Sequence, residues 1–323
     1  MRIFYRGQGE YKKKCEAIGE ALGLELGKHE ARVYPNMSYA INDICMGLKR
    51  LYSHKKTAFY VKNQDPHIEE PMKNVAKEGL SVKALDFSEL QTPDSFIETL
   101  DRESHFLVYS VDNPILGGLN DYSAFETAIS EKAFFRVRLS YNAHRFNGIP
   151  KAERNVVHCL GLPNGMAVVL MGERVRFPSQ GVEKLDWADL DVDSCLEVLK
   201  NAEEDKARVE KFEAESELGF QSFFSSDDSR LYDRAVIYWT DMDSAAVVQS
   251  LADDLKPAGE ELRFESLSLS RWGGLRTMDW LIEQGRKPEE VRGLMVISAS
   301  QLTDEFTEKL KNVRQQILEA QGC

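Results

Sequence analysis

The sequence predicts an α/β fold in which a mixed, mostly parallel seven-stranded sheet between helices forms a large domain, followed by a smaller C-terminal α+β domain. First, short apolar segments alternate with segments of helical period along the chain. Second, after Asn155 only a handful of residues separates successive apolar segments, so no crossover helix fits and those strands must run antiparallel to a neighbour. Third, Ser222–Ser229 is rich in serine and aspartate and predicts a hinge, which divides the chain into domains at 1–221 and 222–323.

The elements of the large domain follow from local patterns. Ser38 begins a helix, because the apolar residues between Ile41 and Leu51 are spaced so that they fall on one face of a helix. Proline at position 66 and Asp121 mark the starts of two later helices. Strands are expected at Thr57–Val61, Ser81–Leu85, Phe106–Val111, Phe134–Leu139, Asn155–Leu160, Ala167–Met171 and Val175–Phe177, and further helices at His67–Glu78, Pro93–Leu100, Asp121–Ile129 and Asp193–Glu215.

The last hundred residues repeat the alternation on a smaller scale. Suitable helix caps are Asp243 for the first helix of this region and either Ser300 or Thr303 for the last. The expected strands are Ala235–Trp239, Leu262–Leu269 and Leu294–Ser298, and the expected helices are Ser244–Leu255, Leu275–Gln284 and Thr303–Ala320.

Composition narrows the classes of function. The 323 residues are 42% hydrophobic and 29% charged, which is typical of a soluble globular protein. With 41 basic against 53 acidic residues, the net charge of −12 disfavours binding to nucleic acid or to an anionic membrane. The five cysteines contain no C-x-x-C, and the six histidines have no metal-ligand spacing, so no metal site is expected. No signal or membrane-spanning segment is apparent, which predicts a cytoplasmic protein.

In the middle of the chain, strands, a helix and polar residues follow one another in an order that is typical of a cofactor-binding site. In sequence this part of the chain has the strand Phe106–Val111, Asn113-Pro114, the turn Gly117-Gly118, a helix from Asp121, the strand Phe134–Leu139 and Tyr141. This order resembles the cofactor-binding core of pyridoxal-phosphate enzymes of the aspartate-aminotransferase fold. The resemblance implies that Asn113 would hydrogen-bond the phenolic oxygen of the cofactor and that Tyr141 retains the tyrosine of the family.

The resemblance also assigns residues near the start of the large domain. Asn36 and Ser38 open the helix that in the family holds the cofactor phosphate, although the usual glycine is missing. A helix N-cap is the favoured interpretation of these two residues. His67, or Ile68 beside it, would stack on the pyridine ring, and a surface histidine at a helix start is the preferred alternative.

Three groups on which the family's chemistry depends are absent together. The Schiff-base lysine should fall within Gly161–Asn164, yet no lysine occurs between Lys151 and Lys184. The aspartate that keeps the pyridine nitrogen protonated is replaced by Arg138, whose charge would oppose that protonation. Met295 occupies the place of the arginine that binds the substrate carboxylate, with Arg292 close by. We therefore expect a catalytically degenerate protein of this fold that binds no cofactor and acts by binding or assembly.

Two enzymatic alternatives remain open from the sequence. One is a lysine-independent enzyme that uses pyridoxamine phosphate with a histidine, either His158 or His144, in place of the lysine. The other is an ordinary pyridoxal-phosphate transaminase whose lysine is Lys151 or Lys184.

The resemblance further implies a homodimer, with the pocket near the subunit boundary. The remnant pocket would contain Asn36, Ser38, His67, Asn113, Arg138, Tyr141 and Asn164. A buried Arg138 needs a counter-charge, which either Asp112 or Asp121 or a small bound anion, a phosphate or carboxylate, would supply.

Overall fold

A computed structural model describes the chain at residues 8–21, 29–62, 66–113, 115–130, 132, 134–140, 155–161, 166–172, 175, 202–224, 230, 232–255, 264–266, 274–283 and 285–321. The chain divides into two compact units, which we describe separately. Unit 1 holds Met1–Pro114 and Asn120–Lys200, and unit 2 holds Ile115–Leu119 and Asn201–Cys323.

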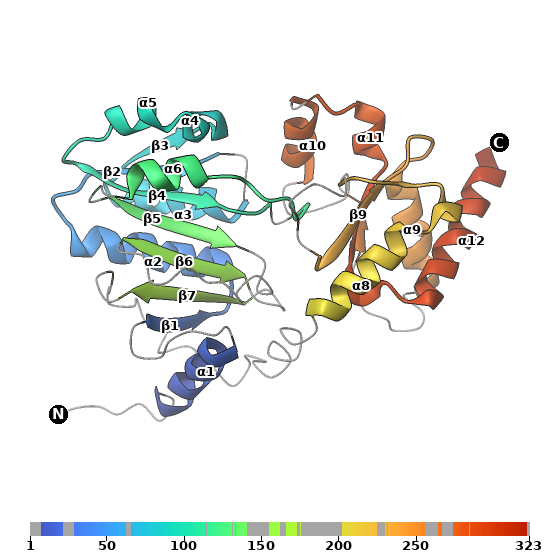
Figure 1. The fold of residues 1–323 in the computed structure, drawn as a ribbon, viewed down its shortest axis with the longest axis horizontal. Coiled ribbons are helices and arrows are strands. Elements are labelled where there is room, and N and C mark those ends of the chain that lie inside the picture. The colour runs from blue at the N-terminus through green and yellow to red at the C-terminus, as the bar shows by residue number, and fades with distance from the viewer. Residues whose placement is uncertain are drawn as a thin grey trace. The chain divides into compact units, whose positions relative to one another are not determined.

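Unit 1 is built on a seven-stranded sheet in the order β1-β7-β6-β5-β4-β2-β3 (Figure 1). Its strands are β1 (His29–Tyr34), β2 (Thr57–Val61), β3 (Ser81–Leu85), β4 (Ser104–Ser110), β5 (Phe135–Ser140), β6 (Val156–Gly161) and β7 (Ala167–Gly172). Strands β2 to β6 are parallel, whereas β7 runs antiparallel to both of its neighbours. The short connection between β6 and β7 leaves no room for a crossover, so the sheet is mixed as the sequence predicts.

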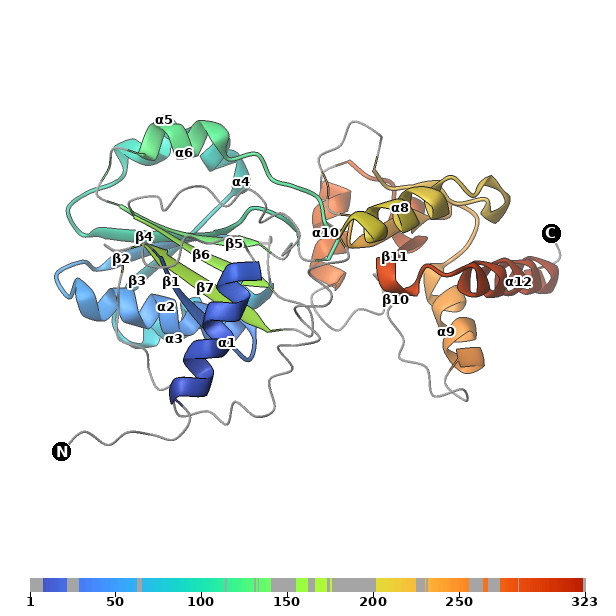
Figure 2. The same ribbon diagram turned by 60° about the horizontal axis from the view of Figure 1, so that its bottom comes forward.

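Helices cover both faces of this sheet, as Figure 2 shows. One face packs on α2 (Met37–Leu51) and α3 (Pro66–Lys77), and the other on α4 (Phe87–Gln91), α5 (Pro93–Glu98) and α6 (Ser123–Ile129). The apolar face of α2 is fully buried at Ile41, Ile44 and Leu48. Helix α1 (Gln8–Ala21) lies beside β1.

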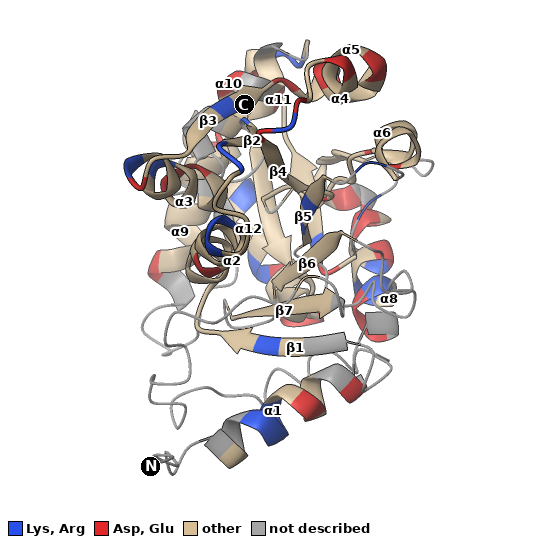
Figure 3. Ribbon diagram, turned by 90° about the vertical axis from the view of Figure 1, so that its left-hand side faces the viewer, with Lys and Arg blue, Asp and Glu red and all other residues tan. Residues whose placement is uncertain are grey.

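In Figure 3 most of the charged residues lie on helices and loops, and few lie on the strands of the sheet. Strand β5 contains two of them, Arg136 and Arg138, which are two residues apart. Side chains two apart on a strand point to the same face. Both arginines therefore lie on the face opposite Phe135, Val137 and Leu139, which pack in the core with α2.

Unit 2 contains a four-stranded antiparallel sheet in the order β10-β11-β9-β8. The strands are β8 (Gln221–Ser222), β9 (Arg234–Tyr238), β10 (Phe264–Ser266) and β11 (Leu294–Ser298), and the α-helices are α8 (Ala202–Glu213), α9 (Ser244–Leu255), α10 (Gly274–Glu283), α11 (Pro288–Arg292) and α12 (Asp304–Gln321). Two 3-10 turns span Ser216–Leu218 and Ala299–Gln301. Trp239, fully buried, sits in the core with α8, α9 and α12 and donates its indole N–H to the carbonyl of Leu218 at 3.1 Å.

The predicted fold class is confirmed, and several local predictions need correction. Helices α1, α4 and α11 and strands β1 and β8 are absent from the sequence prediction. Ser222 belongs to β8 and pairs with Ile237, so the segment expected to be a hinge begins inside a sheet. Of the strand expected at Val175–Phe177, only Val175 is described, and it is not in a strand. The boundary after residue 221 stays a prediction. No helix within the described ranges is long and apolar enough to cross a membrane.

Candidate functional site

The carboxyl ends of several strands in unit 1 meet at one edge of the sheet. Strands β4, β5 and β6 are parallel and end at Ser110, Ser140 and Gly161. Because β7 runs antiparallel to both β6 and β1, β1 also ends at this edge, as does β2. In open α/β sheets, ligands bind outside the carboxyl ends of the strands. The topology therefore brings the segments that contain Asn36, His67 and Asn113 to the edge where a ligand would be expected.

The turn after β4 is fixed by its own polar groups. Asp112 is fully buried, and its carboxylate accepts a hydrogen bond from the hydroxyl of Ser140 at the end of β5. The Ser110 hydroxyl donates to the Asp112 carbonyl at 2.6 Å, and the Asn120 side chain donates to the Ser110 carbonyl at 3.0 Å. These contacts hold the half-buried Asn113 at the edge of the sheet.

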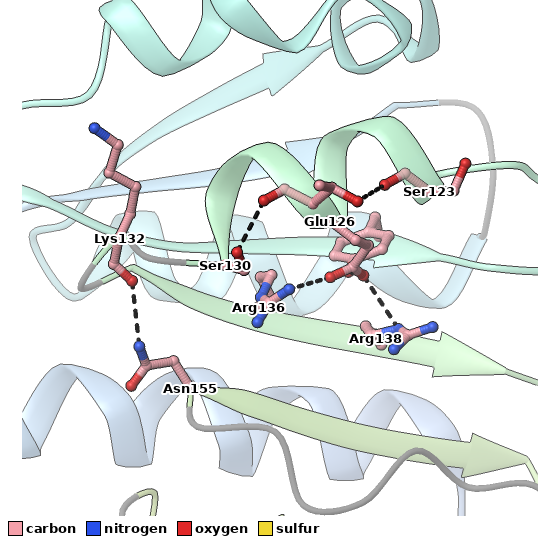
Figure 4. A network of polar contacts seen from close by, with 9 residues as sticks. Ser123, Glu126, Ser130, Lys132, Arg136, Arg138 and Asn155 are labelled. Carbon is pink, nitrogen blue, oxygen red and sulfur yellow. Dashed lines mark hydrogen bonds and ion pairs between the residues drawn. The ribbon is translucent and has the colours of Figure 1, made fainter.

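A second polar group lies between α6 and the face of β5, and Figure 4 shows it from close by. The Glu126 carboxylate on α6 forms ion pairs with Arg136 and, at 3.3 Å, with Nε of Arg138. The same carboxylate accepts a hydrogen bond from the hydroxyl of Tyr109 on β4. Only 5% of the Arg136 side chain and 17% of the Glu126 side chain are exposed. We call Tyr109, Glu126, Arg136 and Arg138 the Glu126 network.

The phenol of Tyr109 is the neutral donor of this network. Burial, and then the charge of the neighbouring Glu126, raise the pKa of Tyr109 well above its ordinary value. The phenol therefore keeps its proton and donates to the carboxylate at any ordinary pH.

The counter-charge of Arg138 is Glu126, and not Asp112 or Asp121 as expected from nearness in sequence. Asp112 accepts from the Ser140 hydroxyl on the turn, and Asp121 accepts from the backbone N–H of Ser123 at 2.9 Å. This hydrogen bond lowers the pKa of the Asp121 carboxyl. Helix α6 begins at Ser123 with Tyr122 as its N-cap, two residues after the start that the sequence predicts at Asp121. An internal salt bridge is therefore present at Arg138, with an acid other than the two that were expected.

Glu126 is not among the residues predicted from the sequence, although the sequence contains a signal for it. It stands within the apolar face of α6, which Tyr122, Phe125 and Ile129 define. An acid inside an apolar helical face requires a partner in the core. Two arginines spaced two apart on the next strand supply that partner.

His158 lies inside β6 and is aligned with Arg138 on β5 and Leu170 on β7. It is buried on the arginine-bearing face of the sheet. Its neighbour Cys159 points to the other face, where its sulfur lies 3.1 Å from the sulfur of Met37. Adjacent side chains on a strand point to opposite faces, so His158 and Cys159 cannot form a catalytic dyad.

The residues at the start of α2 act as a helix start. The Asn36 side chain accepts a hydrogen bond from the backbone N–H of Tyr39 at 2.8 Å, which is the N-cap geometry. Ser38 is half-buried in the first turn, and His67 is half-buried in the first turn of α3. The preferred interpretation of Asn36 as a cap is confirmed.

Several predicted residues lie outside the described residues: Tyr141, His144, Lys151, Asn164 and Lys184. In unit 2, Met295 is fully buried in β11 and Arg292 is exposed at the end of α11. Within the described ranges, no three His, Cys, Asp or Glu side chains gather closely enough to hold a metal ion.

Comparison with known proteins gives a fold and no closer relation. No protein-family model and no curated protein matches the chain. Among solved structures, a NifS-like protein matches with a TM-score of 0.66 at 13% identity, over 96% of this chain and 88% of that one. The cysteine desulfurase CsdA of Escherichia coli matches with a TM-score of 0.62 at 14% identity, over 99% of this chain and 88% of that one.

An aminotransferase is also among the similar structures. The ureidoglycine-glyoxylate aminotransferase of Bacillus subtilis matches with a TM-score of 0.63 at 12% identity, over 98% of this chain and 86% of that one. Identities this low carry information on the fold alone. The chain therefore has an aminotransferase-like fold.

Proposed function

We propose that this protein is a catalytically degenerate member of its fold, which acts by binding or by assembly and not by pyridoxal-phosphate chemistry. The observation that carries the proposal concerns the connection between β6 and β7. In enzymes that the chain resembles, the Schiff-base lysine follows the strand corresponding to β6. Here the connection reads Leu162-Pro163-Asn164-Gly165-Met166, and the sequence has no lysine from 152 to 183. Without that amine, no covalent link to the cofactor aldehyde forms at this position.

The Glu126 network supports the same proposal. Where the resemblance places an acid to keep the pyridine nitrogen protonated, Arg138 brings a guanidinium that is bonded to Glu126. A cation at this position opposes protonation of the ring nitrogen by charge repulsion. The residues of this chain do not fit the cofactor of the family, and we derive no reaction step that uses it.

The position of His158 disfavours the pyridoxamine-phosphate alternative. A histidine that replaced the lysine would stand in the connection after β6, whereas His158 is within the strand and beside Arg138. His144, Lys151 and Lys184 remain the residues through which an enzymatic activity would have to be sought.

Cofactor binding tests the proposal directly. The purified protein, mixed with pyridoxal phosphate, is expected to lack the visible absorption band of an internal aldimine. After borohydride reduction, mass spectrometry of peptides is expected to find no stoichiometric adduct on any lysine. The variants Lys151→Arg and Lys184→Arg are the matched controls, because they identify the site if an adduct forms. A stoichiometric adduct that either variant abolishes would contradict the proposal and indicate a transaminase.

Assembly is the second part of the proposal. Proteins of this fold typically build their pocket at a two-fold interface. Loss of catalytic activity does not remove the apolar surface of such an interface, which must still be buried against a second subunit. We expect a homodimer, with a mass by light scattering of twice the chain mass of 36.7 kDa at micromolar concentration. Dilution to nanomolar concentration serves as the control for weak association. A monomer mass at micromolar concentration would argue against an assembly role.

A further inference from the structure

A β-bulge places one histidine of unit 1 in an unusual position. Strands β2 and β4 pair in parallel, with Thr57 opposite Ser104 but Ala58 opposite Phe106. His105 is therefore the extra residue on β4. A bulge redirects a side chain that regular pairing would send elsewhere. The His105 side chain is fully buried.

Aromatic rings surround the His105 imidazole. Tyr52, at the C-cap of α2, has its ring centroid 5.6 Å away, Phe106 lies at 5.0 Å, and Phe135 on β5 lies at 5.9 Å. All three rings meet the imidazole edge to face. Neither ring nitrogen of His105 has a hydrogen-bond partner within the described part of the chain. A neutral imidazole has an N–H and an acceptor nitrogen, and aromatic rings are only weak partners for them.

The charges that face this imidazole are positive. Lys55, in the loop between α2 and β2, donates its ammonium to the Ser104 carbonyl at 2.9 Å, and His54 stands on the same loop. The nearby carboxylates have other partners. Glu103 pairs with Lys56 at 2.9 Å, and Asp101 binds the backbone N–H and the hydroxyl of Ser104.

The neighbouring strands add no acid to this environment. Strand β5 contributes Phe135, and its next residue, Arg136, points to the opposite face and binds Glu126. Burial first, and then the charges of Lys55 and His54, lower the pKa of His105 to about 4.

The corner around His105 is held together by a few hydrogen bonds. The backbone N–H groups of Lys56 and Thr57 both donate to the Glu103 carbonyl, at 2.9 and 3.0 Å, and Lys55 donates to Ser104. These bonds join the start of β2 to the loop before β4. They form the boundary between His105 and the solvent-exposed loop that contains His54.

We infer that His105 is a pH switch. While its imidazole is neutral, the corner formed by α2, β2 and β4 stays closed, and protonation of the imidazole opens this corner. An imidazolium has no acceptor among these aromatic rings, so it gains solvation only when the corner opens. The sign follows from linkage: a group with a lowered pKa in the folded state binds protons more readily in the open state. Closure is therefore fully favoured above the ordinary pKa of 6.5 and weakens as the pH falls towards 4.

Hydrogen exchange of the Thr57 amide measures this opening in the full-length protein. After correction for the intrinsic exchange rate, opening is expected to increase about 100-fold between pH 7 and pH 4, since each unit of pKa difference is a factor of ten. In His105→Leu the increase should fall to tenfold or less. His67→Gln, a change of a half-buried histidine in the first turn of α3, beyond the opposite end of β2, is the matched control and should keep the 100-fold response.

Two results would overturn the inference. One is an equal pH response of Thr57 in the wild-type protein and in His105→Leu. The other, which needs no variant, is an NMR titration in which the His105 ring of the wild-type protein has a midpoint near 6.5. A titration midpoint of the His105 ring below 5 supports the pH switch, even if His105→Leu does not fold.

Discussion

Alanine at position 293 is expected to prevent unit 2 from folding. A Cβ atom on Gly293 would overlap the carbonyl oxygen of Trp239, and would lie 2.7 Å from its carbonyl carbon and 2.8 Å from its amide nitrogen. Backbone atoms cannot move aside as a flexible side chain can, and Trp239 is anchored in the core by its bond to Leu218. We expect the free energy of unfolding to fall by more than about 4 kcal/mol, which is the range of severe core disruption. Thermal and urea denaturation followed by tryptophan fluorescence would measure it.

Gly9→Ala is the matched control for this substitution. The same added methyl group at Gly9, on α1, meets nothing within 4 Å, and alanine favours a helix over glycine by about 1 kcal/mol. This variant should be as stable as the wild-type protein or more so. A melting temperature of Gly293→Ala within a few degrees of the wild-type value would contradict the close approach of Gly293 to the Trp239 backbone.

Glu126→Gln should cost unit 1 about 3 kcal/mol of unfolding free energy, which is typical of breaking a buried ion pair. The substitution keeps the shape of the side chain and removes the charge that Arg136 and Arg138 share. It also replaces one carboxylate oxygen by an NH₂ group, which cannot accept from Tyr109 or from a guanidinium. Urea denaturation of the full-length protein, followed by circular dichroism, would measure the loss.

The control for Glu126→Gln is the same change at an exposed ion pair. Glu204 on α8 pairs with Arg208 at 3.2 Å, but 68% of its side chain is exposed. Its replacement by glutamine should cost less than about 0.5 kcal/mol. The double variant Glu126→Gln, Arg138→Met should recover part of the lost stability, because it removes one of the two stranded charges. Equal effects of Glu126→Gln and Glu204→Gln would mean that the network contributes no more than a surface pair.

The sequence predicts the interior of the fold well, because buried strands are continuous apolar runs between turn residues. The bounds of β2, β3, β11 and α9 agree with the prediction at both ends. Strand β1 was missed for the opposite reason. It reads His-Glu-Ala-Arg-Val-Tyr, which is neither an apolar run nor a clean alternation. Among residues 31–34, whose side chains are described, only the consecutive Val33 and Tyr34 are buried.

Prediction of the candidate site succeeds where the interaction is local and fails where it is not. The Asn36 cap spans three residues and follows from a polar residue before an apolar-periodic segment. The Arg138 counter-charge depends on how α6 lies across β5, which the order of residues along the chain does not specify. Nearness in sequence points to Asp112 and Asp121, whereas the packing of α6 on β5 brings Glu126 to Arg138.

The place of β1 in the large sheet has a consequence for how the protein is made. Residues 29–34 are synthesised well before their only strand partner within the described sheet, β7 at residues 167–172. Pairings between distant segments form late, because the chain must first close a long loop. Strands β2, β3 and β4 have partners within about fifty residues along the chain, so they can associate before β7 is made. Until then β1 is an unpaired strand, and the charge of Arg32 disfavours its pairing with another nascent chain.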